Sequence, residues 1–241
     1  MFTVNYINVV GSVLPMGNKV FIVIPAFNEE ATIGSVVQNL RKKGYSSIVV
    51  VDDGSSDDTL SVAKNNGARV VAHRLNRGQG AALQTGMDYA VLEGADIIVT
   101  FDADGQHDPS EIKEMISPIL KGEAEVSLGS RFLSKQSNVP FFKKLVLKGG
   151  VLFTYLTTGM LLSDTHNGFR AFSRKAAREL RITQDRMEHA SEIIEQIRIK
   201  HLKHKEVPVT IRYTEYSRKK GQSPLEAARI AFRILLRKIM T

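Results

Sequence analysis

The sequence predicts an α/β fold built on a mostly parallel, doubly wound sheet. Through the first hundred residues, short apolar runs typical of buried strands alternate with segments of helical spacing. Acidic or turn-forming residues follow three of those runs, as expected where strands end at a ligand-binding edge. The chain has 241 residues, 43% of them hydrophobic, which suffices for one sizeable core. We therefore expect one α/β domain.

The predicted elements follow each other in alternation. Each strand is a short apolar run, and each helix begins after turn or capping residues. The expected strands span residues 19–24, 48–51, 68–72 and 96–101. The expected helices span residues 31–40, 60–66, 80–92 and, in the second half, 184–200.

Polar residues gather where three predicted strands end, at residues 25–30, 52–57 and 102–104. Taken singly, Asn28 and Asp57 can be helix caps and Gly54 can be a turn residue. Taken together, the three loops follow parallel strands whose carboxyl ends meet at one edge of the sheet. The sequence therefore predicts a ligand site at that edge.

The third of these loops carries Asp102 and Asp104, one residue apart at the exit of a buried strand. Such a pair is poor core material, but it suits a hard divalent cation such as Mg²⁺ or Mn²⁺, which often also binds substrate phosphates. This predicts chemistry on a nucleotide diphosphate. His107 and His166 lie beside the motifs without zinc-ligand spacing, so we expect supporting roles for them at most.

Composition narrows the partners. The net charge of +8 favours an anionic partner, which is a nucleic acid, an acidic membrane surface or a phosphorylated substrate. The absence of cysteine excludes disulfides, thiolate metal sites and cysteine nucleophiles. Residues 1–18 lack the pattern of a signal peptide, and the apolar stretch 151–162 is shorter than the roughly 20 residues of a spanning helix, so no transmembrane segment is expected.

Seven motifs in order make the chain similar to the family 2 glycosyltransferases, and within them to the branch of dolichol-phosphate mannose synthases and bacterial polyprenyl-phosphate sugar transferases. The motifs are Ile24-Pro-Ala-Phe-Asn-Glu-Glu30, Val51-Asp-Asp-Gly-Ser-Ser-Asp57, Asn76-Arg-Gly-Gln-Gly-Ala-Ala82, Asp102-Ala-Asp-Gly-Gln106, Gly129-Ser-Arg131, Asp164-Thr-His-Asn-Gly-Phe-Arg170 and Glu206-Val-Pro-Val209. They span most of the chain. The resemblance implies a GT-A fold over residues 19–212, followed by a basic loop and an amphipathic helix over residues 213–241.

The resemblance also implies a site. Asp53 is the first choice for a uracil or ribose contact, because a carboxylate accepts hydrogen bonds from a ring N–H or a hydroxyl. The implied nucleotide-binding residues are Pro25, Ala26, Asn28, Glu29, Asp52, Asp53, Gly80, Asp102 and Arg218. The implied metal ligands are Asp102, Asp104 and Gln106, and the implied catalytic residues are Asp104, Asp164 and Arg131.

The segment around Gly78 and Gly80 is not a dinucleotide fingerprint, because Leu83 stands where that pattern requires glycine. Similar transferases often carry lysine at the position of Gln79. Arg77 either replaces a phosphate contact of that lysine or is an ordinary surface charge.

The second half is expected to bind the acceptor. Asp164 resembles the acidic residue that faces the anomeric carbon, although a turn or cap is the alternative. A sugar hydroxyl needs a base, whereas a phosphate monoester is already ionised at neutral pH. A lipid phosphate also needs cationic groups, and Arg131, Arg170 and Arg218 are candidates if they are not surface arginines. Glu188 and Glu192 either shape a sugar pocket or belong to a solvated helix face.

At the C-terminus, arginines recur every fourth residue along an apolar helical stripe, at Arg229, Arg233 and Arg237. Such a helix can lie on an anionic membrane surface, dock on a partner or pack on its own domain. Membrane-embedded relatives carry spanning helices after this point, and this chain ends. A small membrane-protein subunit is therefore an expected partner.

The sequence thus predicts a metal-dependent, inverting glycosyltransferase, peripheral on the cytoplasmic membrane face. It would move a hexose or N-acetylhexosamine from a UDP- or GDP-sugar to undecaprenyl or dolichyl phosphate, with no nucleic-acid partner. UDP-glucose, UDP-N-acetylglucosamine and GDP-mannose all stay open as donors. The alternatives are transfer to a saccharide hydroxyl in cell-surface polysaccharide synthesis and, in another class, a non-catalytic nucleic-acid-binding or scaffold domain.

Overall fold

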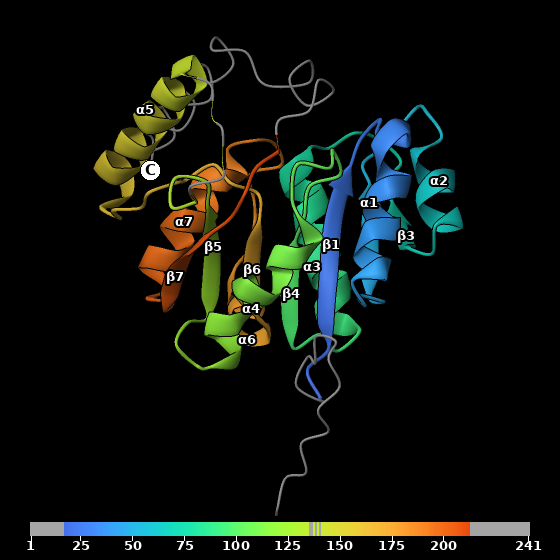
Figure 1. The fold of residues 1–241 in the computed structure, drawn as a ribbon, viewed down its shortest axis with the longest axis horizontal. Coiled ribbons are helices and arrows are strands. Elements are labelled where there is room, and N and C mark those ends of the chain that lie inside the picture. The colour runs from blue at the N-terminus through green and yellow to red at the C-terminus, as the bar shows by residue number, and fades with distance from the viewer. Residues whose placement is uncertain (1–16, 135–136, 138, 140, 213–241) are drawn as a thin grey trace, which may run out of the picture.

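A computed structural model describes residues 17–134, 137, 139 and 141–212 of the chain. Seven strands form one sheet in the order β3-β2-β1-β4-β6-β5-β7, and helices cover both of its faces (Figure 1). The expectation of a mostly parallel α/β sheet is confirmed. The predicted segment 213–241, with Arg218 and the amphipathic helix, lies outside the described residues.

The first half alternates strands and helices as the sequence predicts. Its elements are β1 (Val20–Ala26), α1 (Glu30–Lys42), β2 (Ile48–Asp52), α2 (Thr59–Asn65), β3 (Arg69–Ala72), α3 (Gln79–Leu92) and β4 (Ile97–Thr100). β1 runs two residues beyond the expected end and includes Pro25. Proline is tolerated there because the pairing of β1 with β4 ends at Val23, so no hydrogen bond from the missing N–H is required on that side.

The second half adds the strands that reverse direction. Its elements are the short helix η1 (Pro109–Glu111), α4 (Ile112–Leu120), β5 (Val126–Ser130), α5 (Phe141–Thr158), β6 (Arg170–Ser173), α6 (Arg174–Glu179), α7 (His189–Ile199) and β7 (His204–Pro208). β6 is antiparallel to both β4 and β5, whereas β7 is parallel to β5. The helix expected over residues 184–200 begins only at His189.

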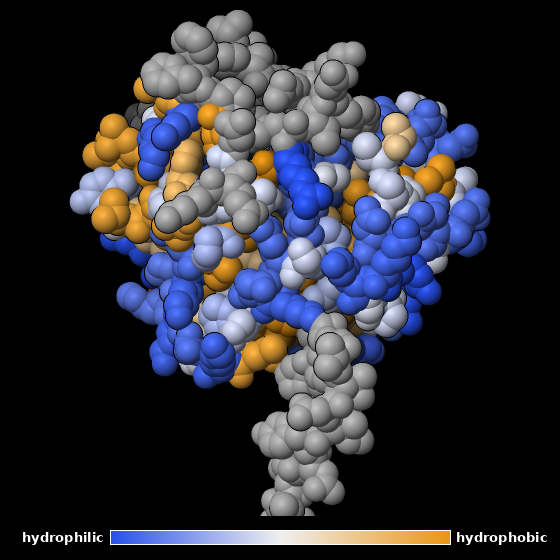
Figure 2. Space-filling view, in the orientation of Figure 1, coloured by the Kyte–Doolittle hydropathy of each residue, from blue (hydrophilic) through white to orange (hydrophobic). Residues whose placement is uncertain are grey.

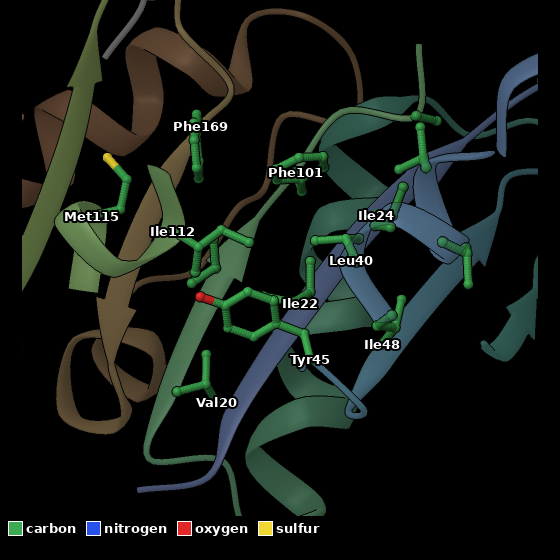
Figure 3. Close-up of a cluster of buried hydrophobic side chains, with 14 of the residues drawn as sticks. Val20, Ile22, Ile24, Leu40, Tyr45, Ile48, Phe101, Ile112, Met115 and Phe169 are labelled. Atoms are coloured by element: carbon green, nitrogen blue, oxygen red, sulfur yellow. The ribbon is translucent and has the colours of Figure 1, made fainter. Parts of the chain in front are cut away.

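A hydrophobic core lies on each face of the sheet. On one face, α1 contributes Ile33, Val36, Val37 and Leu40, whose spacing places them on one side of a helix. Figure 3 shows how Leu40 meets Ile22 of β1 and Ile48 of β2 in this core. The opposite core is built from α3, α6 and α7. Both faces of the central strands are therefore buried, and polar ligands can be bound only at a strand end.

Within the described part of the chain, we find no helix with the length and apolar composition required to cross a bilayer.

Candidate active site

The loops after β1 and β2 are joined by hydrogen bonds. The backbone N–H of Asn28 donates to Ser55 Oγ at 2.9 Å, and Asn28 Oδ1 accepts from the Ser56 N–H at 2.9 Å. Asn28 has a φ of 54°, the left-handed conformation that asparagine tolerates better than most residues. Asn28 therefore bridges two loops and does not cap α1. Asp58 occupies the N-cap position of α2, and the preceding Asp57 accepts from the N–H of Thr59, the first residue of the helix, at 3.0 Å.

Asp52 and Asp53 are both buried, and protein donors already surround Asp53. Asp53 Oδ1 lies 2.7 Å from His73 Nδ1 and accepts from the Arg77 N–H at 3.0 Å, while Oδ2 accepts from the Gly78 N–H at 2.6 Å. Asp53 thus fixes the loop that precedes α3. Because each Asp53 carboxylate oxygen already accepts a hydrogen bond from the protein, a uracil or ribose donor would have to share one of these oxygens. The direct contact stays a prediction.

His73 is a member of this network that sequence analysis missed. Its Nε2 lies 2.9 Å from Thr85 Oγ1 of α3, and its Nδ1 faces Asp53. His73 directly follows β3, so the rule applied to the other strand ends would have singled it out. It ties the end of β3 to both β2 and α3.

The N-terminus of α3 is covered by another loop of the protein. The N–H groups of Gly80 and Ala81 donate to the Asp185 carbonyl at 2.7 and 3.2 Å, and a Cβ on Gly80 would collide with the Gln184 carbonyl. Glycine at position 80 permits this close packing, and its role in cofactor binding stays a prediction. Arg77 lies 3.4 Å from the exposed Asp185 carboxylate, which agrees with the surface-charge alternative.

The acidic pair follows β4, as predicted. Asp102 contacts the buried His107 twice: its N–H donates to Nδ1 at 3.2 Å, and its Oδ2 lies 3.3 Å from Nε2. Asp104 accepts hydrogen bonds from the N–H and from the side-chain amide nitrogen of Gln106. His107 and Gln106 therefore orient the two carboxylates. The function of Gln106 as a metal ligand stays a prediction.

Asp102 and Asp104 are half-buried, and this partial desolvation disfavours two neighbouring negative charges. Desolvation raises the pKa of Asp102 to about 6, and burial together with the charge of Asp102 raises the pKa of Asp104. Desolvation also lowers the pKa of His107 to about 4, so this neighbour is neutral at pH 7. The oxygen donors of Asp102, Asp104 and Gln106 fit a hard divalent cation, whose charge would relieve the repulsion.

No cluster of three or more acidic, histidine or cysteine side chains able to hold a metal occurs among the residues that the structure describes. Mg²⁺ and Mn²⁺ commonly fill part of their coordination sphere with water and substrate phosphate oxygens.

The acceptor-side residues form a second, adjoining network. Asp164 Oδ2 accepts from Arg131 Nε at 2.6 Å and from the Arg131 N–H at 3.1 Å. Glu206 of β7 accepts from the Ser163 N–H at 2.8 Å and from the Asp164 N–H at 3.3 Å. The end of β5, the loop before β6 and β7 are thereby held together. Glu206 belongs to a motif noted in the sequence, but its orienting function was not foreseen.

Arg131 and Arg170 are both buried, so the surface-arginine alternative is wrong for these two. Burial lowers the pKa of Arg170 to about 10, against the opposing effect of the Asp164 and Asp102 charges. The Arg170 guanidinium donates to the carbonyls of Thr165 and Ala190, at 3.3 and 3.4 Å. Two cationic groups therefore lie in the interior next to the acidic residues.

Gly168 brings the two networks into contact. A Cβ at this position would lie 2.6 Å from Asp102 Oδ1, and the Gly168 carbonyl accepts from Thr100 Oγ1 at 2.6 Å. The loop that carries Asp164 is thus packed directly against the acidic pair.

Glu188 and Glu192 are buried, so the alternative of a solvated helix face is wrong. Glu192 accepts hydrogen bonds from the N–H groups of Thr183 and Gln184, at 3.0 and 2.9 Å. This carboxylate shapes the 183–185 loop, which explains why α7 begins later than expected. A contribution of Glu188 to a sugar pocket stays a prediction.

Comparison with known proteins agrees with this architecture. The family described as Glycosyl transferase family 2 matches residues 21–181. A UDP-N-acetylglucosamine–dolichyl-phosphate N-acetylglucosaminyltransferase of Methanococcus voltae is 37% identical over 91% of this chain and 96% of its own. A dolichol-phosphate mannosyltransferase of Pyrococcus furiosus is 29% identical, and the match covers 90% of this chain and 64% of that protein.

The fold is shared with a solved structure. Glucosyl-3-phosphoglycerate synthase from Mycobacterium tuberculosis, crystallised with Mn²⁺, UDP and glucosyl-3-phosphoglycerate, superposes with a TM-score of 0.71 at 20% identity, over 91% of this chain and 78% of that one. Fold and site together define a glycosyltransferase of the GT-A type. The chain belongs to glycosyl transferase family 2. The non-catalytic alternative, a nucleic-acid-binding or scaffold domain, is therefore wrong.

Proposed function

We propose that this enzyme transfers a sugar from a nucleoside diphosphate sugar to a polyprenyl phosphate. The observation that carries the proposal is the hydrogen bonding of the Asp164 carboxylate. Its Oδ2 already accepts two hydrogen bonds from Arg131, so this oxygen is poorly placed to take a proton from an acceptor hydroxyl. A phosphate acceptor needs no base, because it is already ionised at neutral pH.

The buried arginines support the same acceptor. Arg131 and Arg170 place two guanidinium groups beside Asp164, and guanidinium geometry matches phosphate oxygens. Incoming phosphate charge would compensate the desolvated cation of Arg170. In the proposed single displacement, a phosphate oxygen of the acceptor forms the new bond to the anomeric carbon as the bond to the nucleotide diphosphate breaks, which inverts the configuration.

The donor would bind at the loops after β1 and β2, where Asn28, Ser55 and Ser56 form one hydrogen-bonded unit. Pro25, Ala26, Glu29, Asp52 and Asp53 complete the proposed nucleotide contacts. Asp102, Asp104 and Gln106 would hold Mg²⁺ or Mn²⁺, which when bound neutralises the charge of the leaving diphosphate. UDP-N-acetylglucosamine is the first donor to test, since the relative from Methanococcus voltae is named for it.

The lipid acceptor implies action at a membrane surface, and we propose peripheral attachment at the cytoplasmic face. A small membrane-protein subunit stays a prediction, as does a contribution of the C-terminal helix.

The test is release of UDP or GDP from a panel of nucleotide sugars, with Mn²⁺ or Mg²⁺, in the presence and absence of dolichyl or undecaprenyl phosphate. Release that requires the lipid with one donor, and that Asp104→Asn abolishes, supports the proposal. Donor-dependent release that requires a saccharide and ignores the lipid would replace it with transfer to a hydroxyl.

A further inference from the structure

The helix α5 presents its large apolar side chains to solvent and its small ones to the protein. Leu145, Leu152 and Leu156 are 64%, 58% and 73% exposed, whereas Thr154 and Thr158 are buried. A helix that packs on a soluble domain normally shows the opposite arrangement. The outer face of α5 therefore fits an apolar environment outside the domain.

The exposed side chains form one continuous face. Leu152 follows Leu145 by seven residues, and Leu156 follows Leu152 by four, which places the three leucines on a single stripe. Tyr155, 44% exposed, and the exposed Lys144 and Lys148 lie along one flank of that stripe. We call these six residues the α5 outer face. Figure 2 shows orange surface gathered over the region where Figure 1 draws α5.

The charges of this segment indicate the partner. Residues 141–162 include three lysines and no aspartate or glutamate. Lysines beside an apolar stripe extend their ammonium groups toward lipid phosphates while their methylene stems stay on the apolar surface, and tyrosine is likewise suited to the boundary. A helix with this pattern lies in the plane of an anionic membrane interface. Its length and apolar content fall short of what crossing a membrane requires.

The position of α5 connects this surface to the site. A Cβ on Gly150 would lie 2.7 Å from His166 Cε1, so the helix packs directly on the loop that carries Asp164. Leu161, 81% exposed, is a further exposed leucine three residues before Asp164. A bilayer against α5 would thus bring lipid phosphates close to Arg131 and Asp164.

We propose that the α5 outer face docks on an anionic lipid bilayer and so presents the acceptor phosphate to the site, an inference that rests on the proposed function. The test is flotation of the full chain with vesicles of phosphatidylcholine alone or with added phosphatidylglycerol. The variant Leu152→Glu/Leu156→Glu removes the apolar stripe. Leu92→Glu is the matched control, because Leu92 is 86% exposed at the end of α3, a separate helix.

We expect Leu152→Glu/Leu156→Glu to lower vesicle partitioning by about tenfold or more for each leucine, since burying a leucine is worth roughly 1.4 kcal/mol or more. Lys144→Gln/Lys148→Gln should weaken binding by about fivefold per lysine on phosphatidylglycerol vesicles and have little effect on phosphatidylcholine. Leu92→Glu should float like the wild type. If the α5 variants float unchanged, the docking face lies elsewhere and the proposal is overturned.

Two further readouts separate this proposal from the proposed function. Turnover of the leucine variant should fall with vesicle-borne polyprenyl phosphate and stay near that of the wild type with a detergent-dispersed short-chain acceptor. Flotation that depends on α5 in an enzyme that transfers nothing to any polyprenyl phosphate would preserve the docking and refute the function. A changed oligomeric state in size-exclusion chromatography with unchanged flotation would assign the face to a second copy and overturn the docking.

Discussion

Arg131 and Asp164 form an ion pair in the interior, with Arg131 Nε 2.6 Å from Asp164 Oδ2 and both side chains almost completely buried. The backbone N–H of Arg131 donates to the same oxygen. Because the arginine directly follows β5 and the loop before β6 carries the aspartate, the pair fixes the acceptor side of the candidate site to the sheet. The same contact decides what Asp164 can do chemically.

Replacement of Asp164 by asparagine should leave part of the activity with a polyprenyl phosphate acceptor, because the phosphate nucleophile requires no base. The variant should also be less stable, since breaking a buried ion pair costs about 3–5 kcal/mol, less where the new side chain still accepts a hydrogen bond. The measurements are turnover with lipid phosphate and urea unfolding. Asp96→Asn is the matched control, because Asp96 pairs with Arg174 at a half-exposed site and should cost no more than about 1 kcal/mol. Complete loss of turnover in a folded Asp164→Asn enzyme would favour a base-catalysed reaction on a hydroxyl.

Asp104→Asn should abolish metal-dependent donor binding and leave the metal-free protein as stable as the wild type, or more stable. The reason is that burial and the charge of Asp102 raise the pKa of Asp104. The folded protein therefore holds two repelling carboxylates at positions 102 and 104, and a neutral amide at position 104 removes that repulsion. Thermal unfolding with and without MnCl₂ and UDP checks this. Asp88→Asn, at a half-exposed position of α3, should keep the wild-type response to Mn²⁺ and UDP. A metal-induced shift that persists in Asp104→Asn would refute the proposed ligand.

Gly168→Ala should weaken metal-dependent UDP binding by about tenfold or more while the sheet stays folded. The added Cβ would meet Asp102 Oδ1 at 2.6 Å and push that carboxylate out of position, and displaced ligands typically cost this much affinity. Gly149→Ala is the control, since a Cβ there meets no atom within 4 Å and a helical alanine is favourable. The measurement is titration calorimetry of UDP with Mn²⁺ present. Equal UDP affinities of Gly168→Ala and Gly149→Ala would show that the close approach of Gly168 to Asp102 does not affect UDP binding.

The stability of the protein should fall on acidification, in part through His189. Burial, with the charge of Arg170, lowers the pKa of His189 to about 4 from an ordinary value near 6.5. The unfolded chain therefore binds an additional proton between these values, so the stabilisation is fully present above pH 6.5 and is lost as the pH falls toward 4. The shift corresponds to at most about 3–4 kcal/mol.

His189→Asn removes this titration while retaining a donor for the Arg186 carbonyl, which the native Nδ1 contacts at 2.7 Å. The stability of the variant, measured by urea unfolding at several pH values, should decline less steeply between pH 6.5 and 4. His204→Asn is the control, because His204 lies in an exposed part of β7 and should leave the slope unchanged. Parallel pH profiles of His189→Asn and wild type would show that folding does not shift the pKa of His189.

Local sequence patterns were sufficient for the first half of the fold. The alternation of apolar runs and helical spacing predicted β1 to β4 with their helices, and the acidic residues after β1, β2 and β4 predicted the edge that carries the candidate site. These inferences succeed because periodicity and turn chemistry act over a few residues. They also follow from a general rule for parallel sheets, whose carboxyl ends share one edge.

Only the tertiary structure shows which charged residues are buried. Arg131, Arg170 and Glu192 look like surface charges in the sequence, and their burial depends on partners 33, 20 and 9 residues away in the chain. The apolar stripe of α5 looks like core, yet it faces outward because small residues of that helix pack against the domain. Hydropathy along the chain shows which residues share a helix face but not which face is covered, because coverage depends on contacts between distant segments. The sequence by itself thus determined the alternation of β1 to β4 with their helices and the sheet edge at which the candidate site is expected. Long-range packing determined which charges are buried there and which apolar face remains exposed.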